Sequence, residues 1–297
     1  MQADQYSRTA LAAAFYRAQH HLHDEPKLLD DPYAHRLLTA AEMAALTQRY
    51  VRVGLELGGA SGDPETVLAR ALRETTAAAT VLARARYAED RLSMAVERGV
   101  AQYVLVGAGL DTFAFRGGDG VEVFELDHPQ SQAVKRGRLA AAGLAEPPNL
   151  HFGTVDFERE SVATALGRLP FQPDQPAVFA WLGVTMYLTR AAIEGTWRTM
   201  RSVAARGSEL VFDFIHPDAL SETAPPPVRK LLERVRAVGE PIITGLDPAA
   251  LGAELLGTGW TLIEQLDAAE IDKRYFAMRK DGYRARRLGH LACAGVI

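Results

Sequence analysis

Cysteine is nearly absent from this 297-residue sequence, where Cys293 is the single example. One cysteine cannot form an intrachain disulfide, so a disulfide-stapled secreted scaffold is excluded. No apolar run approaches the roughly 18 residues that a membrane-spanning helix needs. The start, Met1–Arg8, lacks the basic stretch and apolar core of a signal peptide. We therefore expect a cytoplasmic protein with no membrane partner.

An excess of one charge sign is also lacking. The formal net charge is −4, and Lys and Arg are scattered along the chain. A nucleic-acid partner is not expected, because such proteins concentrate basic residues on one surface. Hydrophobic residues make up 48% and charged residues 24%, which is typical of a globular protein. A small-molecule substrate is favoured as the partner.

Strand signals are missing from the first third of the chain. Apolar residues recur at helical spacing over Ala40–Leu57 and Val67–Val96, and Asp63-Pro64 is typical of a helix start. We expect residues 1–98 to form a helical cap that contributes to a cofactor and substrate pocket.

Strand and helix patterns alternate over the second region, residues 99–297. The predicted strands are Tyr103–Val106, Val121–Leu126, His151–Val155, Ala177–Leu182, Glu209–Ile215, Thr261–Leu266 and Arg274–Met278. The predicted helices between them are Gln130–Ala142, Arg190–Ala205 and Pro248–Leu256. This alternation predicts an α/β, Rossmann-like domain with helices on both faces of a mostly parallel sheet.

One insertion, residues 217–246, interrupts the alternation with Ala224-Pro-Pro-Pro227 and a charged amphipathic stretch. Long insertions at the carboxyl ends of strands often form lids or substrate walls. A lid is our prediction, and a solvated surface excursion is the alternative.

A glycine loop, Gly107-Ala-Gly109-Leu-Asp-Thr112, follows the first predicted strand. Its glycines permit positive φ and close approach of a ligand to the backbone. Asp127 lies 20 residues after Gly107, where a carboxylate can accept hydrogen bonds from the ribose of a nucleoside cofactor. Thr112 replaces the third glycine of the dinucleotide motif, which favours S-adenosylmethionine over NAD. Asp156 follows the third strand and could accept from an adenine amino group or cap a helix.

Motifs along almost the whole chain match a known family. They are Ser7–Leu11, Leu29–Tyr33, Arg84–Asp90, GAGLDT with Phe113–Arg116, FELDHP at Phe124–Pro129 with Lys135, and MYL at Met186–Leu188. Together they resemble the leucine carboxyl methyltransferase family and its bacterial S-adenosylmethionine-dependent relatives in polyketide and other secondary metabolism. The resemblance implies a class I methyltransferase sheet of seven strands, the last antiparallel.

The resemblance also implies roles for particular residues. Arg84, with Arg86 as its rival, would hold the methionine carboxylate of the cofactor. Gly107 would contact the methionyl part, and Asp127 would bind the ribose. Asp156 and Phe157 would frame the adenine. Many relatives carry an acid where this chain has Leu182, so a contact from that acid must come from backbone here or be absent.

Methyl transfer to a hydroxyl or amine needs a general base, whereas a carboxylate nucleophile needs none. Candidate bases at strand ends are His128, Tyr187, Asp213 and His216, of which we favour Tyr187 and then His216 as catalytic. For each of them taken singly, a packing or capping role is the more common one. Another run, His20-His21-Leu22-His23-Asp24, lacks a second ligand group at zinc spacing, so no metal site is expected.

These features favour an S-adenosylmethionine-dependent methyltransferase that O-methylates a hydroxyl or carboxyl of a small molecule, with a place in secondary metabolism. The alternatives are a protein C-terminal carboxyl methyltransferase, a nicotinamide-dependent oxidoreductase and a non-catalytic cofactor binder.

Overall fold

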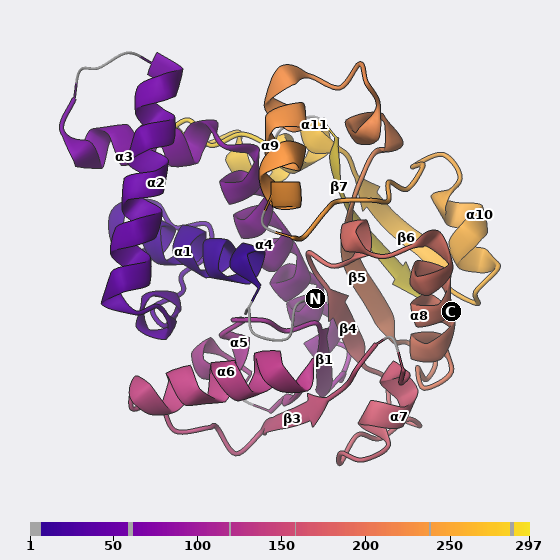
Figure 1. Ribbon diagram of the computed structural model, residues 1–297. Helices are drawn as coiled ribbons and strands as arrows, with labels where there is room; N and C mark the ends of the chain where they lie inside the picture. Colours follow the sequence, from indigo (N-terminus) through magenta and orange to yellow (C-terminus); the bar gives the residue numbers. More distant parts are fainter. Residues whose placement is uncertain (1–6, 59–61, 119, 158, 238, 286–287) are drawn as a thin grey trace.

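The computed structural model describes residues 7–58, 62–118, 120–157, 159–237, 239–285 and 288–297. A single seven-stranded sheet runs through it, in the order β3-β2-β1-β4-β5-β7-β6 (Figure 1). The strands are β1 Gln102–Val106, β2 Glu122–Asp127, β3 Leu150–Thr154, β4 Val178–Trp181, β5 Glu209–Ile215, β6 Thr261–Leu266 and β7 Gly289–Gly295. Strands β1 to β5 pair in parallel, and β7 pairs antiparallel with both β5 and β6.

The central strands β1, β4 and β5 are buried on both faces, which explains their nearly continuous apolar sequences. Successive residues of β1 alternate between two cores: Tyr103 and Leu105 join one, and Val104 and Val106 join the other. The first core contains α1 and α4, and the second contains α8 and α10. The carboxyl ends of β1 to β5 therefore open onto one edge between two helical layers.

Helices fill the N-terminal region and the three intervals between strands where the sequence predicts them, and shorter helices that it does not predict lie elsewhere in the sheet region. Before the sheet come α1 Arg8–His23, η1 Ala34–Leu37, α2 Ala40–Gly58, α3 Pro64–Glu74 and α4 Thr76–Val96. Within the sheet region lie α5 Phe113–Arg116, α6 Pro129–Ala141, α7 Val162–Leu166, η2 Thr185–Tyr187, α8 Arg190–Arg201, η3 Pro217–Leu220, α9 Pro226–Ala237, α10 Leu251–Leu256, α11 Ala268–Ile271 and the π-helix η4 Asp272–Phe276.

Two details of the N-terminal helices bear on the sequence predictions. The Asp63 carboxylate caps α3 by accepting from the backbone N–H groups of Glu65 and Thr66, which confirms the predicted helix start. The expected helix Val67–Val96 is two helices, because the backbone at Thr75 is extended.

The prediction of a strand at Arg274–Met278 was wrong. That segment falls in the π-helix η4 and the turn after it, and Met278 is 93% exposed. The seventh strand is β7, which is built mainly from Gly, Ala and Cys and so lacks the β-branched residues that indicate a strand. Its small residues fit a crowded site, because a Cβ at Gly295 would lie 2.6 Å from Ile263 Cδ1.

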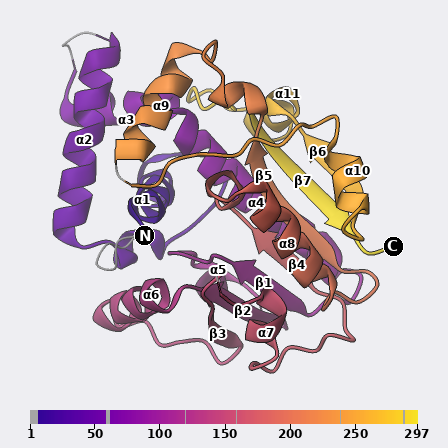
Figure 2. The same ribbon diagram turned by 45° about the vertical axis from the view of Figure 1, so that its right-hand side comes forward.

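The insertion carries α9, which lies beside the N-terminal helices in both views (Figures 1 and 2). Among the described helices, none is long and apolar enough to cross a membrane.

Candidate active site

The glycine loop leaves β1 in a conformation that requires glycine. Gly107 has φ of 74° and Gly109 has φ of 52°, in the left-handed region that other residues rarely adopt. The backbone N–H groups of Gly107 and Ala108 both donate to the Leu126 carbonyl, at 2.8 and 3.2 Å. A Cβ at Gly107 would lie 2.9 Å from Val184 Cγ2, so the loop is packed closely against the end of β4.

Asp127 closes the loop from the neighbouring strand. Its Oδ2 accepts from the Gly109 N–H at 2.6 Å, and its Oδ1 accepts from the His128 N–H at 2.7 Å. Burial raises the pKa of Asp127, and the two backbone donors offset that effect only in part. Each carboxylate oxygen has two acceptor positions, so both can still receive a ligand hydroxyl.

Asp156 and Phe157 follow β3, the next strand along this edge. The Asp156 side chain is 35% exposed, with Oδ2 3.5 Å from Arg159 Nε. Its backbone carbonyl accepts from the N–H groups of Arg159 and Glu160, so the residue begins a turn. The helix after it, α7, is capped by the Ser161 side chain, and Phe157 is 36% exposed. An exposed ring and a carboxylate thus stand next to the strand that carries Asp127.

Arg84 reaches the same edge from α4. Its Nη1 donates to Asp213 Oδ2 at 3.0 Å, and its guanidinium lies against Gly183, which has φ of 72°. The rival Arg86 points elsewhere, donating to Asp90 at 2.7 Å and to the Leu28 carbonyl at 3.4 Å. Of the two arginines, Arg84 is the one that stands at the ends of β4 and β5.

Asp213, on β5, is held on both sides. It is 1% exposed, and its Oδ1 accepts from the Gly183 N–H at 2.5 Å. Both oxygens are therefore directed to the end of β4, where one meets a backbone donor and the other meets Arg84.

Tyr187 lies in η2, just past β4, and its side chain is near Thr9 at the start of α1. Burial raises the pKa of Tyr187 above its ordinary value of 10.0, although Arg84 and Thr9 lower it. The phenol is consequently protonated at neutral pH and acts as a hydrogen-bond donor or acceptor there.

His216 lies on the other face of the sheet. It comes two residues after Phe214, which joins the core opposite to α4, so alternation directs its side chain away from Asp213. Its Nδ1 accepts from the Asp218 N–H at 3.1 Å, and its ring centre lies 6.0 Å from that of His290. The structure does not bring His216 together with Tyr187.

The histidine run near the N-terminus has partners within the chain. Buried His20 hydrogen-bonds Asp24 at 2.7 Å, and its Nε2 accepts from the Leu28 N–H at 2.8 Å. Over the described part of the chain, no three His, Cys, Asp or Glu side chains group as metal ligands would.

Comparison with known proteins decides the family. The family described as leucine carboxyl methyltransferase matches residues 10–201. The chain belongs to the leucine carboxyl methyltransferase family. It is 30% identical over 294 residues to YktD of Bacillus subtilis, a candidate S-adenosyl-L-methionine-dependent methyltransferase, with 96% of each chain covered. A relative from Saccharopolyspora erythraea, with the same candidate activity in its name, is 33% identical over 209 residues, which are 70% of this chain and 67% of that one.

Solved structures share the fold of this family member. A candidate methyltransferase from Thermobifida fusca superimposes with a TM-score of 0.55 and 16% identity, over 99% of this chain and 96% of that one. A DUF574 family protein from Streptomyces avermitilis gives a TM-score of 0.55 and 16% identity, over 83% and 97%. With the observed strand order, these matches confirm the predicted Rossmann-like methyltransferase fold.

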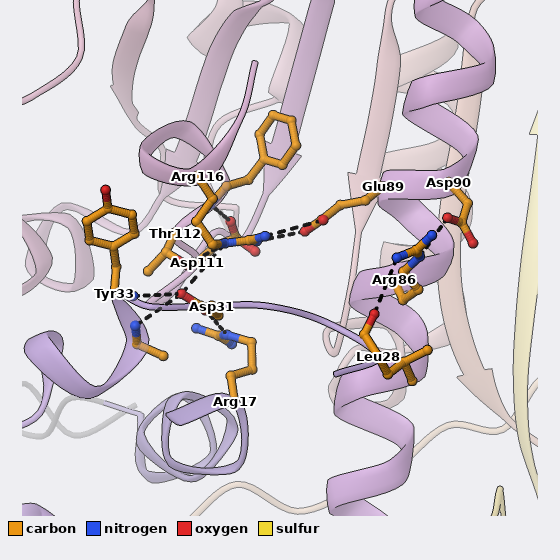
Figure 3. A network of polar contacts seen from close by, with 12 residues as sticks. Arg17, Leu28, Asp31, Tyr33, Arg86, Glu89, Asp90, Asp111, Thr112 and Arg116 are labelled. Carbon is orange, nitrogen blue, oxygen red and sulfur yellow. Dashed lines mark hydrogen bonds and ion pairs between the residues drawn. The ribbon is translucent and has the colours of Figure 1, made fainter. Parts of the chain in front are cut away.

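A buried ion network that sequence reasoning missed holds the glycine loop of this family member (Figure 3). Arg17 of α1 donates to Asp31 Oδ2 at 2.8 Å and to the Leu110 carbonyl at 2.6 Å. Asp31 is fully buried, and its Oδ1 also accepts from the backbone N–H groups of Tyr33 and Ala34. The available signal was the Leu29–Tyr33 motif, whose contacts depend on residues far away in the sequence.

The other half of the network runs from the loop to α4. Arg116 donates to Thr112 Oγ1 at 3.1 Å and to both carboxylate oxygens of Glu89 (Figure 3). Its Nε also lies 3.6 Å from Asp31. Thr112, at the position of the third glycine in dinucleotide motifs, thus anchors the loop through its side chain.

Glu240, from the insertion after β5, contacts the first turn of α1. Its two carboxylate oxygens accept from the backbone N–H groups of Arg8 and Thr9 at 3.0 and 3.2 Å. A carboxylate at a helix N-terminus is favourable because the first N–H groups have no partner within the helix. The insertion and the N-terminal helices therefore meet beside Tyr187.

Proposed function

We propose that this chain is an S-adenosylmethionine-dependent methyltransferase that O-methylates a small molecule. The single observation that carries the proposal is that the glycine loop, Asp127 and Arg84 lie together at one edge of the sheet in a member of this family. The cofactor is supported by the names of the two relatives described above.

The residues of this edge fit the cofactor. Positive φ at Gly107 and Gly109 opens the backbone, and Asp127 can receive both ribose hydroxyls. Asp156 and Phe157 would frame the adenine, and Arg84 would hold the methionine carboxylate. When bound, the cofactor supplies an electrophilic methyl group, and the protein's task is to align the acceptor with it.

The state of each candidate base favours a carboxyl group as the methyl acceptor. Tyr187 keeps its proton at neutral pH, and Asp213 is paired with Arg84. His216 faces the other side of the sheet, and His128 caps α6 by accepting from the Gln130 N–H. A carboxylate nucleophile is already ionised and needs none of these residues as a base. We propose that Tyr187 orients the acceptor by hydrogen bonding.

The same edge defines the proposed division of the chain. Residues 1–98 would act as a cap over the cofactor and substrate, and residues 217–246 would act as a lid, latched by Glu240. We further propose that the protein acts in secondary metabolism and is located in the cytoplasm.

A second candidate is methylation of a protein C-terminal carboxylate, which the family description itself favours. Incubating the protein with methyl-labelled S-adenosylmethionine and either cell extract or C-terminal peptides separates the two. A labelled small molecule supports our proposal, and a labelled peptide supports the alternative.

Calorimetry tests the cofactor site directly. Asp127→Ala should weaken S-adenosylmethionine binding at least tenfold, because charge-assisted hydrogen bonds to the ribose are worth about 1.5–3 kcal/mol. Asp174→Ala, at an exposed aspartate, should bind as the wild type does. Unchanged affinity in Asp127→Ala would contradict the site.

A further inference from the structure

Asp213 is a buried acid at the carboxyl end of β5, and its position suggests that it binds a ligand. We infer that its carboxylate receives the α-ammonium group of the methionyl end of the cofactor, a role that residue 182 cannot fill because it is leucine. This inference rests on the proposed function and assigns one residue within it.

The pairing of Arg84 with Asp213 complements an amino acid. The α-ammonium and α-carboxylate groups of an amino acid are attached to the same carbon, so their receptors must be opposite charges side by side. Arg84 Nη1 and Asp213 Oδ2 are 3.0 Å apart at the ends of β4 and β5, and β4 is the neighbour of β1, the strand that leads into the glycine loop. The receptor for the ammonium group therefore lies next to the arginine that would hold the carboxylate.

Asp213 is also fixed in place before any ligand arrives. The Gly183 N–H and the Thr185 hydroxyl donate to its Oδ1 and its backbone carbonyl, at 2.5 and 2.6 Å. Only 2% of its side chain is exposed, against 18% for Arg84. A preformed acceptor of this kind loses little conformational entropy on binding.

The other carboxylates of this edge are less suited to an ammonium group. Asp127 is on β2, separated from β4 by β1, at the position where a ribose would lie. Glu240 already accepts from two N–H groups of α1.

The sheet register explains why an acid at 182 is dispensable. Strands β4 and β5 are parallel with Trp181 opposite Phe212, so the next positions, Leu182 and Asp213, are neighbours on one face. Leu182 packs against the core that contains α4, the helix that carries Arg84. A carboxylate at either position would therefore stand beside the same arginine.

Calorimetry with three ligands tests the assignment: S-adenosylhomocysteine, its deamino analogue that keeps the carboxylate, and methylthioadenosine, which lacks the amino-acid end. Asp213→Asn should weaken S-adenosylhomocysteine binding about 10–100-fold, the range for a lost charge-assisted hydrogen bond. It should leave the affinities for the other two ligands within about twofold. In the Asp213→Asn background, Leu182→Glu should restore much of the lost affinity.

Glu209→Gln is the matched control, because Glu209 is a buried, arginine-paired acid at the opposite end of β5. It should bind all three ligands as the wild type does. An equal loss for S-adenosylhomocysteine and methylthioadenosine in Asp213→Asn would overturn the inference in favour of a structural role, and so would unchanged S-adenosylhomocysteine binding. If the wild type bound none of the three ligands, the proposed function itself would be contradicted.

Discussion

At the scale of single residues, this site depends on close approach between backbone and side chains. Gly183 shows this best, because a Cβ there would lie only 2.5–2.7 Å from the atoms of the Arg84 guanidinium. Its positive φ also allows its N–H to face Asp213. One glycine thereby fixes the position of both charges.

Gly183→Ala should accordingly displace Arg84. The new Cβ would lie 2.5 Å from Arg84 Nη2, and alanine at this positive φ is strained by about 1 kcal/mol or more. We expect S-adenosylhomocysteine binding to weaken at least tenfold in calorimetry, a loss of about 1.4 kcal/mol. Gly195→Ala, in α8 with nothing within 4 Å of the new Cβ, should bind normally and melt slightly higher. Normal binding by Gly183→Ala would contradict this account of the site.

At the scale of elements, the Asp31 network joins α1, the glycine loop and α4. Burial alone would raise the pKa of Asp31, but Arg17 and Arg116 outweigh it and hold the pKa below its ordinary 3.8. A carboxylate with a depressed pKa stabilises the fold above its unfolded pKa and loses that effect as the pH falls through the folded value.

Asp31→Asn should therefore destabilise the protein by about 3 kcal/mol at neutral pH, because buried Arg17 loses its carboxylate partner and Arg116 keeps only Glu89. Denaturant unfolding at neutral pH and near pH 3 measures this, and the difference from wild type should shrink at the lower pH. Asp30→Asn is the control, since Asp30 is 64% exposed and should change stability by less than about 0.5 kcal/mol. A constant difference at both pH values would argue against the ionised network.

At the scale of the whole molecule, two segments more than 200 positions apart meet over the sheet edge. Glu240 binds the first turn of α1, and α9 lies beside the N-terminal helices (Figure 2). In the proposed lid, this contact would link access to the site to one carboxylate.

Glu240→Gln should loosen this contact, because the neutral amide is a weaker acceptor for two helix N–H groups. We expect faster amide hydrogen exchange across α9 than in the wild type, by roughly threefold or more, as expected for a lost contact of about 0.7 kcal/mol. Glu233→Gln, at an exposed position in α9, should exchange as the wild type does. Equal rates in both variants would show that Glu240 does not hold the insertion.

Local chemistry made much of this fold and site predictable. Strands β5 and β6 match their predicted bounds, because alternating or continuous apolar residues are set by neighbours in sequence. The glycine loop and Asp127 were found for the same reason, since steric limits on φ and the strand-end position act locally. The strand β7 was missed, because its Ala and Gly residues become a strand only between β5 and β6.

The sequence by itself thus determined the fold class, the family and the glycine loop with its acid. It left open whether Arg84 or Arg86 would hold the methionine carboxylate, and it did not explain why Leu182 stands where many relatives have an acid. Tertiary structure separated the arginines and placed Asp213 beside Arg84, although the two residues are 129 positions apart in the chain. The physical reason is that side-chain contacts at a sheet edge depend on strand order and register, which bring distant segments together and leave no mark in local spacing.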